Sequence, residues 1–257
     1  MKYFAGIDVG SLTAKAVLID ENKSILGYYV QPIGYDSLAS GTHVLEQVLK
    51  KAGLKQGDIT GTVTTGYSRK RFSESAIQKT EISCHAKGIS VVFPQARTLI
   101  DVGGQDSKVM KVGNNGRVLD FAMNDKCAAG TGRFVEVMAH ALGLSLNGIS
   151  DSALNHSNEL LLSSTCTVFA ESEIVSLLSQ GNIVPDISWA IMKSIADRVA
   201  ALVGRVGTEK EVAMSGGMAK NQALVQRLAD KLATRILVPE EPQIIGALGA
   251  AVIAMGQ

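Results

Sequence analysis

The chain has 257 residues, enough for two modest domains, and 46% of them are hydrophobic, which is ample material for buried cores. A formal net charge of +1 gives no basic excess for nucleic acid, and there is no acidic run of the kind found in disordered tails. Three cysteines are too few, and odd in number, for a disulfide framework.

Neither end of the chain suggests export or membrane insertion. The N-terminus reaches the acidic residue Asp8 after a very short apolar run, unlike a signal peptide. The longest apolar stretch, residues 244–255, is far shorter than the ~20 residues of a membrane span. We therefore expect a soluble, cytoplasmic protein with no membrane or nucleic-acid partner.

An internal repeat is the clearest feature of the sequence. Residues 7–10 read Ile-Asp-Val-Gly, residues 100–103 read the same, and at the same offset Lys15 corresponds to Lys108. Each copy follows a short apolar strand and leads into another, at residues 16–19 and 109–112, which predicts two hairpins with glycine turns. Two matched hairpins indicate two similar α/β lobes.

The turns of these hairpins are suited to phosphate. Glycine at Gly10 and at Gly103–Gly104 lets the backbone approach an anion closely, and its N–H groups can cradle phosphate oxygens. Ser11 and Thr13 add hydroxyl donors, and Lys15 adds a positive charge. The alternative is two ordinary tight hairpins, but a pair of matched copies favours phosphate binding.

Two carboxylates are predicted at the ends of the strands that lead into these turns. Asp8 and Asp101 can each hold a Mg²⁺ ion through its waters or orient an attacking water. Gln105 can also position that water. These three residues are our candidates for catalysis at a bound phosphate.

Two cysteines each precede a predicted helix. Cys127 lies in residues 124–134 and Cys166 in residues 164–173. The helical apolar series are Phe134, Val137, Met138, Ala141 and Leu142 after the first, and Phe169, Ile174, Leu177 and Leu178 after the second. The positive end of a helix favours a thiolate.

Two thiolates are half of the four that a [4Fe–4S] cluster needs, and a two-fold axis between subunits would supply the other half. The alternative is two buried structural thiols, as we expect for Cys84. Gly130 and Gly132, just behind Cys127, can bring backbone to a nucleotide and let the following helix pivot.

Two further small-residue segments lie near the C-terminus. A glycine turn at residues 214–221 follows a strand at residues 212–213 and precedes a helix, so it could admit an adenine or ribose. Residues 246–251 open the last helix, and the amide of Gln243 just before it suits an adenine edge. Each segment alone is more often a packing feature than a binding site.

The motifs together resemble known families. Asp8-Val-Gly-Ser, Asp101-Val-Gly-Gly and Ser215-Gly-Gly-Met are similar to the phosphate and adenosine motifs of the acetate and sugar kinase, Hsp70 and actin superfamily. Residues 124–133 and 164–171 resemble the signature segments of the 2-hydroxyacyl-CoA dehydratase activators, a family that includes the ATP-binding subunits of benzoyl-CoA reductases and the reductases of double-cubane-cluster proteins. The resemblance covers essentially the whole chain.

The resemblance implies an α/β fold of two ribonuclease-H-like (actin-like ATPase) lobes with a nucleotide cleft between them. We expect the lobes at residues 1–95 and 96–257, with the last helix packing back on the N-terminal lobe. It implies a homodimer with one bridging [4Fe–4S] cluster held by Cys127 and Cys166, with ATP/ADP and Mg²⁺, and with Mg²⁺ held through water by Asp8 and Asp101. The implied nucleotide residues are Ser11, Leu12, Thr13, Ala14, Lys15, Gly103, Gly104, Gln105, Gly130, Gly132, Gly216, Gly217 and Gln243.

The implied function is an ATP-dependent electron-transfer activator. It would take electrons from reduced ferredoxin or flavodoxin and pass them to a 2-hydroxyacyl-CoA dehydratase, an aromatic-CoA reductase or a double-cubane-cluster protein. A small-molecule kinase of the same superfamily is the alternative, and a non-enzymatic nucleotide-dependent regulator or chaperone is a second one. The short chain and the two cysteine segments argue against both.

Overall fold

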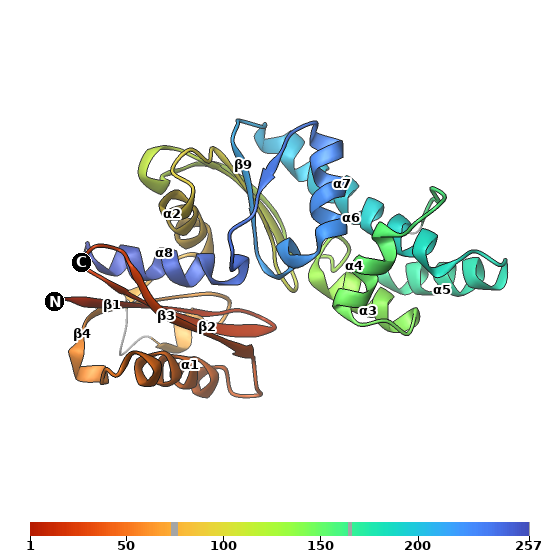
Figure 1. The fold of residues 1–257 in the computed structure, drawn as a ribbon. Coiled ribbons are helices and arrows are strands. Elements are labelled where there is room, and N and C mark those ends of the chain that lie inside the picture. The colour runs from red at the N-terminus through yellow and green to blue at the C-terminus, as the bar shows by residue number, and fades with distance from the viewer. Residues whose placement is uncertain (73–76, 164–165, 257) are drawn as a thin grey trace. The chain divides into compact units, whose positions relative to one another are not determined.

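The computed structural model describes residues 1–72, 77–163 and 166–256 (Figure 1). The strands are β1 (Tyr3–Val9), β2 (Thr13–Asp20), β3 (Ile25–Pro32), β4 (Ile59–Thr65), β5 (Ile77–Gln78), β6 (Thr98–Val102), β7 (Ser107–Val112), β8 (Val118–Asn124), β9 (Val212–Ser215) and β10 (Ile236–Leu237). The α-helices are α1 (Ser37–Ala52), α2 (Glu81–Val92), α3 (Gly132–Ala141), α4 (Leu146–Leu154), α5 (Thr167–Ser179), α6 (Val184–Val206), α7 (Gln222–Leu232) and α8 (Ile245–Ala254). Short 3₁₀ helices occupy Gln56–Asp58, Arg69–Phe72, Asn114–Gly116, Gly217–Lys220 and Pro242–Ile244.

The strands form two five-stranded sheets, in the orders β3-β2-β1-β4-β5 and β10-β9-β6-β7-β8. By internal contacts the chain forms two units: unit 1 is Met1–Leu99, Met110–Asp120 and Pro239–Gln257, and unit 2 is Ile100–Val109 and Phe121–Val238. The expected lobes at residues 1–95 and 96–257 stay a prediction. The predicted strands of both hairpins, the helices after Cys127 and Cys166, and the last helix are confirmed.

The central strands β1 and β2 of the first sheet, in unit 1, are buried on both faces. β1 pairs antiparallel with β2 and parallel with β4, and Asp8 lies opposite Lys15 on one side and Thr65 on the other. Because side chains alternate along a strand, Ala5, Ile7 and Val9 share one core with α1. Phe4 shares the other core with α8, and Asp8, an even number of residues away, projects to that α8 face.

Glycines bring α8 into direct contact with the sheet and with α2. A Cβ at Gly6 would lie 1.9 Å from the Ala247 carbonyl oxygen, and one at Gly249 would lie 1.7 Å from that of Cys84. No side chain fits in that space. The interpretation that the small residues at 246–251 permit close helix packing is therefore confirmed.

Unit 2 has its core around the long helix α6, which contacts both α4 and α7. The core also includes Ile100, Val102 and Val109 from the second sheet. Helix boundaries are set by local capping: the Ser145 hydroxyl accepts from Gly148 N–H at the start of α4, and Asn221 Oδ1 accepts from Leu224 N–H at the start of α7.

Helix α5 differs in one respect from the predicted pattern. The helix forms where expected, but its buried residues are Ala170 and Ile174, whereas Phe169 is 68% exposed. Val168 and Val175 are also exposed. Helical spacing predicted the helix correctly but did not say which of its apolar residues are buried, because apolar residues lie on more than one side of α5.

Candidate nucleotide loops and the cysteine segments

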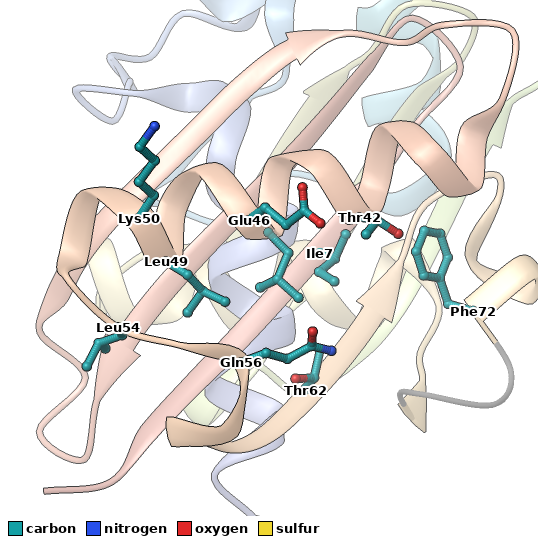
Figure 2. A pocket seen from close by; sticks show the side chains of 10 residues that line it. Ile7, Thr42, Glu46, Leu49, Lys50, Leu54, Gln56, Thr62 and Phe72 are labelled. Carbon is teal, nitrogen blue, oxygen red and sulfur yellow. The ribbon is translucent and has the colours of Figure 1, made fainter.

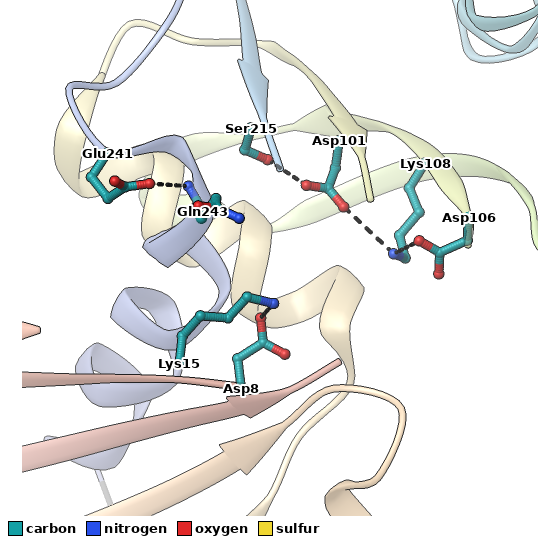
Figure 3. Close-up of polar contacts among 8 residues, drawn as sticks. All are labelled: Asp8, Lys15, Asp101, Asp106, Lys108, Ser215, Glu241 and Gln243. Atoms are coloured by element: carbon teal, nitrogen blue, oxygen red, sulfur yellow. Dashed lines mark hydrogen bonds and ion pairs between the residues drawn. The ribbon is translucent and has the colours of Figure 1, made fainter. Parts of the chain in front are cut away.

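The first loop joins β1 to β2. Its turn is closed by the Gly10 N–H, which donates to the Thr13 carbonyl oxygen at 3.0 Å. Asp8 is 5% exposed at its side chain, and Lys15 Nζ donates to its Oδ2 at 3.2 Å (Figure 3). A Cβ at Gly10 would lie 3.3 Å from Lys15 Nζ, so the ammonium group lies beside the turn as well. A carboxylate and a cation therefore meet at this glycine turn.

The predicted residues Ser11, Leu12, Thr13 and Ala14 form the rest of this loop and the start of β2. The N–H of Gly10 is already used within the turn, so a phosphate at this loop would have to contact neighbouring groups instead of that N–H. Gln243 belongs to unit 1 too, in the 3₁₀ helix before α8, where its N–H donates to Glu241 Oε1 at 3.1 Å (Figure 3).

The second loop joins β6 to β7 and repeats this geometry with more partners. The Gly103 N–H donates to the Asp106 carbonyl oxygen at 2.9 Å. Lys108 Nζ lies 2.7 Å from Asp106 Oδ1 and 3.5 Å from Asp101 Oδ2, and the Ser215 hydroxyl donates to Asp101 Oδ1 at 2.8 Å (Figure 3). The side chains of Lys108 and Asp101 are 4% and 3% exposed. Asp101 is thus fixed by two donors in a buried setting.

Sequence reasoning missed Asp106 as a partner of Lys108. The position that corresponds to Asp106 in the first copy is Thr13, so the repeat carried no signal for a second carboxylate. Gln105, the third catalytic candidate, is an exposed residue of the same loop. Gly104 lies beside it and accepts a hydrogen bond from the Arg133 N–H at 2.8 Å.

The third glycine turn packs directly on the second loop. Gly216 has a φ of +87°, and a Cβ there would lie 2.4 Å from the Val102 carbonyl oxygen and 2.9 Å from Asp101 Oδ1. Only glycine combines this backbone conformation with this approach. The next residue, Gly217, is exposed at the start of the 3₁₀ helix that precedes α7.

Gly66 is a counterpart of Gly216 that the sequence did not reveal. Its φ is +96°, and a Cβ there would lie 2.4 Å from the Val9 carbonyl oxygen and 2.6 Å from Asp8 Oδ1. Asp8 and Asp101 therefore each have a glycine from a neighbouring strand end against the Oδ1 atom. The repeat is more complete in space than in sequence, because Thr65-Gly66 and Ser215-Gly216 share only the glycine.

Cys127 and Cys166 are both exposed in unit 2. Cys166 is the N-cap residue of α5, and its side chain makes no capping hydrogen bond. Cys127 lies in the loop before α3, where Asn124 Nδ2 donates to the carbonyl oxygens of Cys127 at 3.0 Å and Ala129 at 3.1 Å. Ser164 and Thr165, part of the second cysteine segment, lie outside the described residues.

Cys84 differs from the other two cysteines. It is fully buried in α2, and burial raises the pKa of its thiol to about 12, although the nearby Thr65 hydroxyl opposes the rise. A thiol with such a pKa stays protonated at neutral pH, which agrees with the interpretation of Cys84 as a core residue.

Backbone hydrogen bonds join the second loop to the Cys127 segment. The Gly132 N–H donates to the Gly103 carbonyl oxygen at 2.9 Å. A Cβ at Gly132 would lie 3.0 Å from that same oxygen, so glycine is needed here for close approach. Gly130 has a φ of +88°, and its carbonyl oxygen accepts from the Ser107 hydroxyl. The start of α3 is therefore attached to the loop that carries Asp101.

The segment before Cys166 is attached to α6. The Asp186 carboxylate accepts from the Ser157 N–H at 2.7 Å and from the Asn158 N–H at 3.1 Å and Nδ2 at 3.0 Å. These bonds lower the pKa of Asp186 below its ordinary value, and the bond from the Ser157 N–H has the largest effect. The His156 ring stacks on Trp189 with ring centroids 4.0 Å apart. Residues 156–158 are thus held firmly against α6.

A separate cavity of about 390 Å³ lies in unit 1 between α1 and the first sheet (Figure 2). It is lined by Ile7 from β1, Thr62 from β4, and Leu45, Glu46 and Leu49 from α1, among others. Ile7 faces the opposite side of the sheet from Asp8. None of the predicted site residues lines this cavity.

The described residues include neither a membrane-spanning helix nor a cluster of metal-binding side chains. No helix in residues 1–72, 77–163 or 166–256 is both long enough and apolar enough to cross a membrane. Within the same ranges, no three His, Cys, Asp or Glu side chains are grouped so as to hold a metal ion.

Comparison with known proteins gives a consistent result. Residues 5–254 match the model of the BadF/BadG/BcrA/BcrD ATPase family. The chain is 44% identical to the 2-hydroxyisocaproyl-CoA dehydratase activator of Clostridioides difficile, over 99% of this chain and 96% of the relative. It is 42% identical to the (R)-2-hydroxyglutaryl-CoA dehydratase activating ATPase of Acidaminococcus fermentans, over 98% and 96%.

A solved structure confirms the expected fold. The activator of the 2-hydroxyisocaproyl-CoA dehydratase from Clostridium difficile with bound ADPNP superimposes with a TM-score of 0.94 at 44% identity, covering 99% of this chain and 94% of that one. The expected α/β fold of two sheets with helices is therefore confirmed. From the family match and these two relatives, we conclude that the chain belongs to the BadF/BadG/BcrA/BcrD ATPase family and is an ATPase.

Proposed function

We propose that this ATPase activates a dehydratase or reductase by delivering single low-potential electrons. The observation that carries the proposal is its 44% identity, over 99% of the chain, to a 2-hydroxyisocaproyl-CoA dehydratase activator. The partner would be a 2-hydroxyacyl-CoA dehydratase, an aromatic-CoA reductase or a double-cubane-cluster protein. Reduced ferredoxin or flavodoxin would be the electron donor, and the cytoplasm the compartment.

In this proposal Cys127 and Cys166 are the ligands of a [4Fe–4S] cluster. Their chemistry fits, because both thiols are exposed and cysteine sulfur is the usual ligand of a [4Fe–4S] cluster. Each chain offers two ligands where the cluster needs four, so two copies related by a two-fold axis share one cluster. When bound, the cluster would carry the single electron that is passed on.

The exposed apolar side chains of α5 support a homodimer. Val168, Phe169 and Val175 project from the helix that begins directly after Cys166, and Phe169 is 68% exposed. Apolar groups so close to a proposed cluster ligand would be covered when a second copy brings its own Cys166 to the same place. We therefore assign this face of α5 to the dimer interface.

The nucleotide would be bound through the glycine loops, with Asp8 and Asp101 as anchors for the waters of Mg²⁺. Both carboxylates are buried and each has a lysine beside it, so their positions are well determined. Gln105 is exposed on its loop and free of the packing that holds Asp101, which suits a residue that orients water. Ser11, Thr13, Lys15, Gly104, Gly217 and Gln243 are assigned to nucleotide contacts.

ATP would act on the cluster through α3. The Gly132–Gly103 hydrogen bond attaches the start of α3 to the loop that carries Asp101, and Cys127 lies in the segment just before α3. A change in that loop on binding or hydrolysis would therefore move the Cys127 segment. This supports coupling of the two sites without a direct contact between nucleotide and cluster.

The test is the iron and sulfide content of protein purified without oxygen, measured per dimer with sedimentation of the same sample. We expect four irons per dimer in the wild type, and loss of the cluster in Cys127→Ser and Cys166→Ser. Cys84→Ala is the control and should keep the cluster, because the Cys84 thiol is buried. Full iron content in either exposed-cysteine variant, or a monomer with a full cluster, would refute the assignment.

ATPase assays complete the test. Turnover should require Mg²⁺ and should fall in Asp8→Ala and Asp101→Ala far more than nucleotide affinity does, because binding is shared among many donors. Phosphate transfer from ATP to a sugar or acid by cluster-free protein would instead support the kinase alternative.

A further inference from the structure

His85 is a buried histidine that belongs to none of the predicted nucleotide loops. It lies in α2, next to Cys84, and is 6% exposed. Buried histidines are uncommon unless their ring nitrogens are used. Its position relative to Asp8 suggests what this ring does.

His85 and Asp8 face the same small space above Gly246, at the start of α8. A Cβ built on Gly246 would lie 2.7 Å from His85 Nε2 and 3.0 Å from Asp8 Oδ2. The two atoms are therefore no farther apart than the sum of these distances, which is within reach of a single bridging water. The missing side chain of Gly246 leaves that space open to the two polar atoms.

A second hydrogen-bond donor would help to hold Asp8, because Lys15 lies close both to Asp8 and to the Gly10 turn. Lys15 Nζ donates to Asp8 Oδ2, the same atom that faces His85, and it also lies beside the Gly10 turn. If Lys15 turns toward a bound phosphate, its hydrogen bond to Asp8 weakens. On the other side of the carboxylate, the backbone at Gly66 lies close to Oδ1. A donor from α2 would then keep the carboxylate in place.

We propose that His85 is a positioning residue for Asp8, and that its Nε2 atom holds Oδ2 directly or through one water. The inference rests on the proposed role of Asp8 in ATP hydrolysis. It requires no proton transfer, since the imidazole only donates a hydrogen bond. Groups that orient a metal-anchoring carboxylate in this way typically contribute about 10–100-fold to activity.

The experiment compares Gln and Asn at position 85 in the cluster-loaded dimer. The amide nitrogen of Gln can reach the place of Nε2, whereas that of Asn corresponds to Nδ1 and falls short. We expect His85→Ala and His85→Asn to lower the kcat of ATP hydrolysis roughly 10–100-fold with little change in KM. His85→Gln should recover most of the loss. Gly246→Ala, which fills the shared space, should lower kcat as His85→Ala does.

His43→Gln is the matched control, because His43 is an exposed histidine of α1 and should keep wild-type kinetics. Wild-type kcat in His85→Ala, or equal kcat in the Gln and Asn variants, would overturn the proposal. The proposal would also be overturned if the loss of kcat paralleled a loss of unfolding temperature across the variants, because a purely structural residue would give that result. Asp8→Ala is assayed in parallel: wild-type turnover there would refute the role of Asp8 itself, which separates the two failures.

Discussion

The two lysines of the internal repeat should differ in what they do for stability. Lys15 and Lys108 occupy equivalent positions, but Lys108 bridges two carboxylates and its side chain is 4% exposed, against 13% for Lys15. Replacing Lys108 by Met leaves the buried Asp101 charge with Ser215 but without a cation. Removing one partner of a buried pair costs roughly 3–5 kcal/mol. Lys15→Met removes the charged hydrogen bond to Asp8, which is more accessible to solvent than the Lys108 pair and contributes about 1.5–3 kcal/mol.

The measurement is urea unfolding, followed by thermal unfolding of the same variants. At roughly 2–4 °C per kcal/mol for a chain of this size, Lys108→Met should lower the unfolding temperature by on the order of 10 °C. Lys231→Met is the surface control, because Lys231 pairs with Asp197 while 53% exposed and should cost less than about 1 kcal/mol. An equal or larger loss in Lys15→Met would refute the reasoning from burial.

Three further changes follow from contacts in unit 2. The lowered pKa of Asp186 means that its contribution to stability is present above its unfolded pKa of about 3.9 and is lost as pH falls through the lower folded value. Acid titration followed by the fluorescence of Trp189, the one tryptophan, should show this step, and Asp186→Asn should remove it. Gly216→Ala should cost at least about 1–3 kcal/mol from backbone strain alone, measured by urea unfolding, whereas Gly204→Ala, in open space on α6, should not destabilise. Gly132→Val should weaken nucleotide binding, measured by calorimetry, while the cluster still assembles; unchanged affinity would remove the Gly132–Gly103 contact from the coupling.

Much of the fold was predictable because its signals are local. Apolar strands around a glycine turn predict the hairpins at residues 7–19 and 100–112. Apolar residues at helical spacing predict the helices after both cysteines. The exposure of Phe169 was not predictable, because spacing alone does not say which apolar side of α5 is buried within one chain. A helix that is apolar on several sides is resolved only by what packs on it.

The partners of the candidate carboxylates were not predictable, because they come from strands distant in sequence. Ser215 contacts Asp101 from the end of the neighbouring strand β9, and Gly66 contacts Asp8 from the end of β4. His85 reaches the space beside Asp8 from α2, and this space exists because Gly246 has no side chain to fill it. Such contacts are set by sheet order and helix packing, which short motifs do not encode.

The spatial repeat explains why glycine is needed at four places, of which the sequence motifs indicated three and left out Gly66. Gly10 and Gly103 close the hairpin turns, while Gly66 and Gly216 press a strand end against the Oδ1 atoms of Asp8 and Asp101. In each copy the carboxylate is held at Oδ1 by backbone packing and at Oδ2 by a lysine. The copies then diverge: the second is fixed by Asp106 and Ser215, and its loop is hydrogen-bonded to the cysteine segment through Gly132. A rigidly held carboxylate transmits a displacement of its loop to whatever the loop is bonded to. We therefore expect the second loop to couple ATP to the proposed cluster, and the first loop, which has Lys15 beside its turn and His85 nearby, to adjust to the phosphates.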